Sequence, residues 1–184
     1  LKVGVDLGTA YIVLVVLDEE NNPIACEKQA ASVLKDGVVV DYSGALQIVR
    51  RLKEKLEARL GGRELVNCAI AMPAGTESSI KTHQYVAEGA GLEVTNVLDE
   101  PTAANSIYQI EDGVVVDIGG GTTGLAILKG GKVVRIEDEP TGGTHVTLVL
   151  VGNYHISFEE AEAIKQDYAR HREILPVAKA VVEK

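Results

Sequence analysis

The stretch DIGGGTTG, residues 117–124, decides how this chain is interpreted. It follows the apolar run VVV and places Gly119, Gly121 and Gly124 at the G-x-G-x-x-G spacing of dinucleotide-binding loops. That motif requires a helix to open at the glycines, because the pyrophosphate rests on the helix N-terminus. The sequence continues instead as LAILKGGKVVRI, where two adjacent glycines would cost a helix roughly 2 kcal/mol relative to alanine. We therefore predict two strands joined by a tight turn, which disfavours a dinucleotide fold.

A second copy of this pattern lies at the start of the chain. DLGTA, residues 6–10, follows an apolar run in the same way, and KVGVDLGTAYIVLVVLDEENNPIACEKQ predicts strand, glycine turn, strand, polar turn and strand. The chain thus contains one meander twice, which predicts two related lobes, residues 1–110 and 111–184. No strand follows the last helical stretch, EILPVAKAVVEK, so we expect the second lobe to be truncated.

The segments between the two meanders alternate between helix and strand. Apolar residues recur from Ile48 to Leu60 at helical spacing, which predicts an amphipathic helix with the Lys53–Glu57 pair on its exposed side. VNCAIAMP, a helix over 76–88 and LEVTNVL predict a parallel crossover, and DEPTAANSIYQ opens a further helix. GGTHVTLVLVG and SFEEAEAIKQDYA predict helices after the second meander. The fold class is therefore α/β.

The amino-acid composition restricts the kinds of partner that the protein can bind. The 184 residues carry a formal net charge of −9, which disfavours nucleic acid and anionic membranes, because both require concentrated Lys and Arg. No apolar run is long enough for a membrane span and no signal peptide is evident, so we expect a cytoplasmic protein. Cys26 and Cys68 lack metal-ligand spacing and are expected to be buried, reduced thiols. The four histidines also lack such spacing.

The two glycine turns have more polar groups than a plain hairpin needs. A hairpin whose glycines only supply positive φ is one interpretation. However, three consecutive glycines followed by two threonines, with Gly8 and Thr9 in the first copy, expose many amides and hydroxyls, which suit phosphate oxygens. The two hairpins are therefore predicted to grip a phosphate chain from opposite sides.

An aspartate directly precedes each glycine turn. Asp6 and Asp117 would repel a polyphosphate unless a hydrated Mg²⁺ lay between them. We expect these two carboxylates to hold Mg²⁺ mostly through water. The alternative is that each aspartate only caps its own turn.

Three motifs, VDLGTAY, LDEPTAA and VDIGGGTTG, resemble in order and spacing the first phosphate, first connecting and second phosphate motifs of the superfamily of actin, DnaK-type heat-shock chaperones and sugar kinases. KDGVVVDY, DEPTGGTHVTLVL and SFEEAEAIK are also similar to a chaperone-like ethanolamine-utilisation family within that superfamily. The resemblance implies an actin-like ATPase (ribonuclease H-like) fold that binds ATP or ADP with Mg²⁺.

The resemblance also implies roles for individual residues. Glu100 would orient the attacking water and, with Asp6 and Asp117, form the catalytic set. The part that packs on the adenosine would include Gly143, Glu162 and Lys165. The β- and γ-phosphates would be contacted from both loops, by Gly8, Thr9, Ala10, Tyr11, Gly119, Gly120, Gly121 and Thr122.

Two departures from the chaperone pattern concern hydrolysis. The second phosphate motif ends in Gly124 where the chaperones have Asp, and Lys35 is no convincing substitute for the chaperone lysine near the γ-phosphate. We expect a chaperone-like ATP-binding protein with a slow Mg²⁺-dependent ATPase cycle. Its client would be an ethanolamine-degrading enzyme or a component of a bacterial microcompartment, with which it would associate. The alternatives are a nucleotide sensor or scaffold that does not hydrolyse ATP, and a filament-forming actin-like protein.

Overall fold

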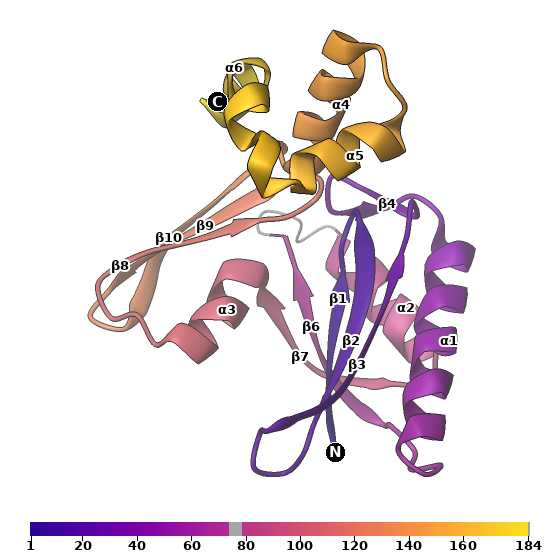
Figure 1. The fold of residues 1–184 in the computed structure, drawn as a ribbon. Helices are drawn as coiled ribbons and strands as arrows, with labels where there is room; N and C mark the ends of the chain where they lie inside the picture. Colours follow the sequence, from indigo (N-terminus) through magenta and orange to yellow (C-terminus); the bar gives the residue numbers. More distant parts are fainter. Residues whose placement is uncertain (74–78, 184) are drawn as a thin grey trace.

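A computed structural model describes residues 1–73 and 79–183 of the chain. The fold is α/β and is built on two main sheets, of strand order β3-β2-β1-β6-β7 and β10-β9-β8 (Figure 1). The strands are β1 (Lys2–Leu7), β2 (Tyr11–Leu17), β3 (Pro23–Ala30), β4 (Leu34–Lys35), β5 (Val38–Val39), β6 (Asn67–Met72), β7 (Glu93–Asp99), β8 (Gly113–Ile118), β9 (Thr123–Lys129) and β10 (Lys132–Glu139). The helices are α1 (Tyr42–Arg59), α2 (Ile80–Gly89), α3 (Glu100–Tyr108), α4 (Gly143–Tyr154), α5 (Phe158–Gln166), a 3₁₀ turn (Tyr168–Arg170) and α6 (His171–Val182).

The five-stranded sheet combines an antiparallel meander with a parallel crossover. β1 pairs with β2 and β2 with β3 in antiparallel fashion, whereas β6 lies parallel to β1 and β7 parallel to β6. Helices α1 and α2 cover one face of the sheet and enclose the main core. The meander and the crossover predicted from the sequence are thus confirmed. Of the helix predicted over 76–88, residues 76–78 lie outside the described residues.

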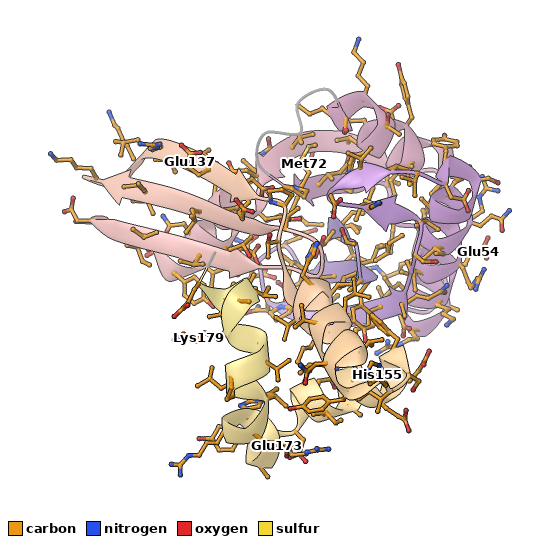
Figure 2. The ribbon with its side chains drawn as sticks, turned by 90° about the horizontal axis from the view of Figure 1, so that it is seen from above. Glu54, Met72, Glu137, His155, Glu173 and Lys179 are labelled. Atoms are coloured by element: carbon orange, nitrogen blue, oxygen red, sulfur yellow. The ribbon has the colours of Figure 1, made fainter. Side chains whose placement is uncertain are left out.

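Helix α1 begins and ends where its terminal residues favour it. The Asp41 side chain caps the N-terminus by accepting a hydrogen bond from the Gly44 amide at 2.9 Å, and Gly61 and Gly62, both at positive φ, end the helix. Figure 2 shows Glu54 on the outer side of this helix.

The prediction that Lys53 and Glu57 lie on the exposed side of α1 is wrong. Lys53 is buried, with its Nζ 2.6 Å from Glu57 Oε1, because the chain that follows the helix folds back over this face. Glu57 also accepts a hydrogen bond from the Leu65 amide at 2.8 Å, which fixes that returning segment.

The prediction for the two cysteines is half right. Both thiols are free, and Cys68 is buried beneath the helices, but Cys26 is exposed. Cys26 lies opposite Val15 on the face of the sheet that α1 and α2 leave uncovered. An apolar strand sequence does not reveal which of its two faces is covered, which is why the expectation failed.

The second meander forms the three-stranded sheet, and α3 lies between the two sheets (Figure 1). Asp99 caps α3 by accepting a hydrogen bond from the Thr102 amide at 2.8 Å, and Pro101 occupies its first turn. Helices α4, α5 and α6 pack together at the end of the second sheet. No helix in the described ranges is long and apolar enough to cross a membrane.

Candidate functional site

The two glycine loops touch each other at the ends of the meanders. A Cβ atom added at Gly120 would lie 2.8 Å from the Ala10 Cβ, and one added at Gly121 would lie 2.7 Å from the Thr9 Oγ1. Side chains at these positions would therefore separate the loops. Glycine is required here by the close approach of the first loop to the second.

The plain-turn interpretation of the second loop is wrong. None of Gly119, Gly120 and Gly121 has the positive φ that such a turn would require of its glycines. Gly130 and Gly131 in the next turn provide the contrast, because both have positive φ and no neighbouring atom within 4 Å of an added Cβ. The turn between β9 and β10 is thus an ordinary hairpin, whereas the loop between β8 and β9 is shaped by contact.

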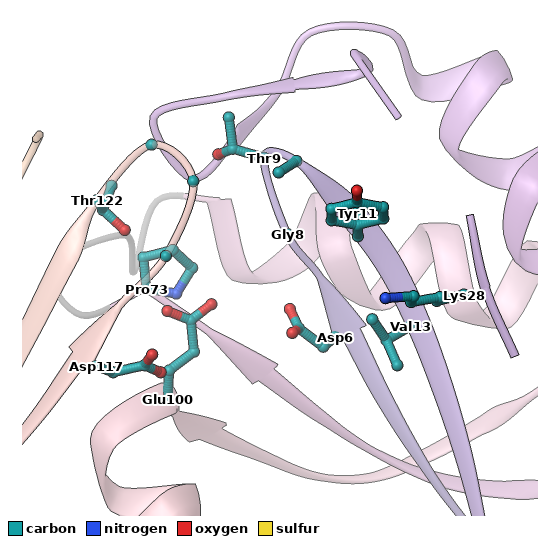
Figure 3. A pocket seen from close by; sticks show the side chains of 14 residues that line it. Asp6, Gly8, Thr9, Tyr11, Val13, Lys28, Pro73, Glu100, Asp117 and Thr122 are labelled. Atoms are coloured by element: carbon teal, nitrogen blue, oxygen red, sulfur yellow. The ribbon is translucent and has the colours of Figure 1, made fainter. Parts of the chain in front are cut away.

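A pocket of about 270 Å³ lies where the loops meet. Figure 3 shows the carboxylates of Asp6, Glu100 and Asp117 directed into it, with Lys28 entering from the side of β3. Asp6 comes from the end of β1, Asp117 from the equivalent position of β8, and Glu100 from the first residue of α3. The structure thus brings together every residue expected to contact phosphate or Mg²⁺. The full lining is Asp6, Gly8, Thr9, Ala10, Tyr11, Val13, Lys28, Pro73, Glu100, Asp117, Gly119, Gly120, Gly121 and Thr122.

The three carboxylates are difficult to ionise together. Burial, assisted by the neighbouring charge of Asp117, raises the pKa of Asp6 to about 6. Burial and then the charges of Asp6 and Asp117 raise the pKa of Glu100 to about 8, so Glu100 is mostly protonated at pH 7. Burial raises the pKa of Asp117 as well. Shifts of this size are typical of sites that bind a cation or perform proton transfer.

The buried carboxylate of Asp6 is chemically suited to a hydrated cation. Across the described residues, no three His, Cys, Asp or Glu side chains lie close enough together to hold a metal ion. The Asp6 Oδ1 atom is nevertheless buried without a hydrogen-bond partner. A cation that keeps its water shell would supply both the missing hydrogen bonds and the missing positive charge, and Mg²⁺ usually keeps several waters.

The residues expected to pack on adenosine form a separate polar cluster. Lys165 Nζ lies 2.6 Å from Glu162 Oε2, 2.9 Å from Thr147 Oγ1 and 3.1 Å from the Gly143 carbonyl oxygen. Burial opposes ionisation of Glu162, but hydrogen bonds from Lys165 and Thr147 lower its pKa overall. This cluster lines a neighbouring cavity of about 920 Å³ that also reaches Thr9 and Gly120. The expected phosphate and adenosine residues are therefore adjacent.

Sequence reasoning did not identify two charged residues near the site, Lys28 and Asp138. Lys28 lines the pocket from β3. Lys35, by contrast, lines the larger cavity. Asp138 lies opposite Gly124 in the second sheet, its Oδ1 is buried without a hydrogen-bond partner, and its charge acts on Glu100. Lys28 and Asp138 each lie on the last strand of a meander, β3 and β10 respectively. Only the register between strands brings them close to the loops.

Comparison with known proteins identifies the class of fold. A family model described as cell division protein FtsA matches residues 114–179. The structure of MreB5 of Spiroplasma citri bound to ADP superposes with a TM-score of 0.67 at 22% identity, covering 89% of this chain and 61% of that chain. At this identity the likeness concerns the fold alone. The chain has an actin-like ATPase fold, as predicted.

Nearer relatives identify the family within that class. The ethanolamine utilization protein EutJ of Escherichia coli K12 is 48% identical over all 184 residues of this chain, which span 64% of the relative's length. The crystal structure of EutJ from Carboxydothermus hydrogenoformans has a TM-score of 0.87 at 57% identity, covering 99% of this chain and 67% of that chain. The chain belongs to the EutJ family.

Proposed function

We propose that this pocket binds the phosphate chain of ATP together with Mg²⁺, between two lobes formed by residues 1–110 and 111–184. The observation that carries the proposal is the meeting of two glycine loops and three carboxylates in one pocket. Each loop supplies backbone amides and a threonine, which suit phosphate oxygens. The cavity beside it, lined by Gly143, Glu162 and Lys165, has room for the nucleoside.

The geometry of the site supports a role for each of its acidic residues. A bound Mg²⁺ would offset phosphate charge and polarise the terminal phosphoryl group. Asp6 and Asp117 face the pocket from opposite sheets and would hold the ion's water shell. Glu100, at the start of α3, would orient the attacking water. It must be ionised to act as a base toward that water, and a nearby cation would favour its ionised form.

The cycle that we favour is slow. Gly124 leaves the second loop without the carboxylate found in the chaperones. We propose a slow ATPase whose lobes close on ATP and reopen after hydrolysis, and which transmits this motion to a protein client. The family name and the resemblance of the motifs to DnaK-type chaperones support a client within ethanolamine utilisation, either a degrading enzyme or a microcompartment component, in the cytoplasm.

The test is a calorimetric titration of MgATP into the full-length protein and three variants. We expect saturable binding by the unchanged protein and at least tenfold weaker binding by Asp117→Asn, which loses a charged partner of the ion. Glu100→Gln should bind with similar affinity but release no phosphate. Glu54→Gln, a matched change on the outer side of α1, should behave as the unchanged protein.

Each outcome separates the candidate functions. Absence of binding by the full-length protein would overturn the proposal. Binding without phosphate release would indicate a sensor or scaffold. Polymer detected by light scattering after addition of MgATP would favour the filament-forming alternative.

A further inference from the structure

The Lys28 side chain extends into the pocket from β3, toward Asp6 (Figure 3). Among the described residues that line this pocket, it is the one with a cationic side chain. A triphosphate brought into the pocket would add negative charge to a site that already holds Asp6, Glu100 and Asp117. One divalent cation would leave that site strongly negative, so a further positive group would contribute to binding.

The strand register explains why Lys28 reaches the pocket. Asp6 of β1 is paired with Val13 of β2, and Val13 is paired with Lys28 of β3. Side chains directly opposite one another in a sheet share a face, so these three residues form one row. With strands spaced about 4.8 Å apart, the backbones of Asp6 and Lys28 are about 10 Å apart. The short side chain of Val13 between them leaves room for a ligand.

The Lys28 ammonium is free to move to that ligand. Its Nζ lies 5.0 Å from the centroid of the Tyr11 ring, and a cation–π contact is weak at an exposed site. No acidic side chain in the described ranges forms an ion pair with it. The adjacent Glu27 points to the opposite face of the sheet, where it pairs with Arg59 of α1.

We propose that Lys28 is a phosphate-binding residue of this site. Its ammonium would leave the Tyr11 ring and contact the terminal phosphate, while Asp6, at the other end of the row, faces the hydrated cation. The proposal rests on the function proposed above and adds to it a specific residue. Lys35 does not compete for this role because it lines the neighbouring cavity.

The experiment measures the binding of ATP, ADP and AMP, each with Mg²⁺, to the full-length protein and to Lys28→Met, Lys28→Arg and Lys55→Met. Lys55 is an exposed lysine of α1 and serves as the control. We expect Lys28→Met to weaken ATP binding roughly 10- to 100-fold, the range for losing a hydrogen bond to a charged group. ADP should be affected less and AMP hardly at all. Lys28→Arg should retain most of the affinity, and Lys55→Met should match the unchanged protein.

Three outcomes would overturn the proposal. If the unchanged protein binds MgATP and Lys28→Met binds it equally well, the role of Lys28 is wrong while the proposed function stands. An equal loss for ATP and AMP would mean that Lys28 does not act on the terminal phosphate. If the unchanged protein binds none of the three nucleotides, the proposed function and the role of Lys28 both fall. Thermal melting without nucleotide should be unaltered in Lys28→Met, because Lys28 is exposed.

Discussion

The two meanders carry equivalent rows of residues. The rows differ in charge and in whether a helix covers them. In the first sheet the row is Asp6, Val13 and Lys28, and in the second it is Asp117, Gly124 and Asp138. Each begins with the aspartate before a glycine loop and crosses three strands. The first row ends in a cation and the second in an acid. The repeat thus fixes where polar groups gather, whereas the individual residues decide what charge they bring.

The middle residue of each row determines how open the row is. Val13 lines the pocket, but Gly124 is buried against α3, and a Cβ added there would lie 3.0 Å from the Pro101 Cγ. Helix α3 therefore covers the middle of the second row and leaves the first row open. This explains why Lys28 lines the pocket while Asp138 acts on Glu100 only through its charge.

The largest expected effect comes from giving the second row the middle residue of the first. Gly124→Val should lower the free energy of unfolding by about 3 kcal/mol, because the added side chain would push against the rigid Pro101 ring. Denaturant unfolding of the full-length protein would measure this change. Gly4→Val is the matched control, since an added Cβ on that strand meets no atom within 4 Å and should change stability by less than about 0.5 kcal/mol. Equal effects of the two changes would show that α3 does not cover Gly124 closely.

The second prediction concerns how the stability of the protein depends on pH. It centres on Glu100, whose pKa is raised by acidic residues of both rows. Burial raises the pKa of Glu100 to about 8, and the pKa values of Asp6 and Asp138 are raised to about 6. A carboxyl whose pKa is raised by folding stabilises the protein below its unfolded pKa, and this contribution is lost as the pH rises through the folded value. The unliganded protein should therefore lose stability as the pH rises from about 5 to about 9.

The variant Glu100→Gln tests the part of this stability loss that occurs at the upper end of the pH range. Between pH 7 and 9 the melting temperature of the unchanged protein should fall a few degrees more than that of Glu100→Gln, since roughly 1 kcal/mol corresponds to about 2–4 °C in a protein of this size. Glu54→Gln should follow the unchanged protein. Parallel curves for Glu100→Gln and the unchanged protein would contradict the raised pKa of Glu100.

Local sequence patterns predicted most of the fold and the central part of the site. Apolar runs, glycine turns and the helical spacing of apolar residues predicted both meanders and α1, the DEP sequence predicted the start of α3, and the aspartates before the loops led to Asp6 and Asp117. The same patterns gave no indication of Lys28, Asp138, the burial of Lys53 or the exposure of Cys26. These four depend on which strands pair in which register and on which faces the helices cover, and both are properties of the assembled sheet.

The smallest expected effect tests whether the second row acts on the site through charge alone. Asp138→Asn should lower the pKa of Glu100, because it removes one of the negative charges that oppose ionisation. The effect should be less than tenfold in proton affinity, since burial, Asp6 and Asp117 all contribute more than Asp138. Titration of the Glu100 carboxyl by NMR would measure it, with Glu137→Gln as the control, because that exposed side chain is paired with Arg135. If the pKa of Glu100 does not change in Asp138→Asn, the two rows are electrostatically independent, and the acid that ends the second row has no part in the pocket.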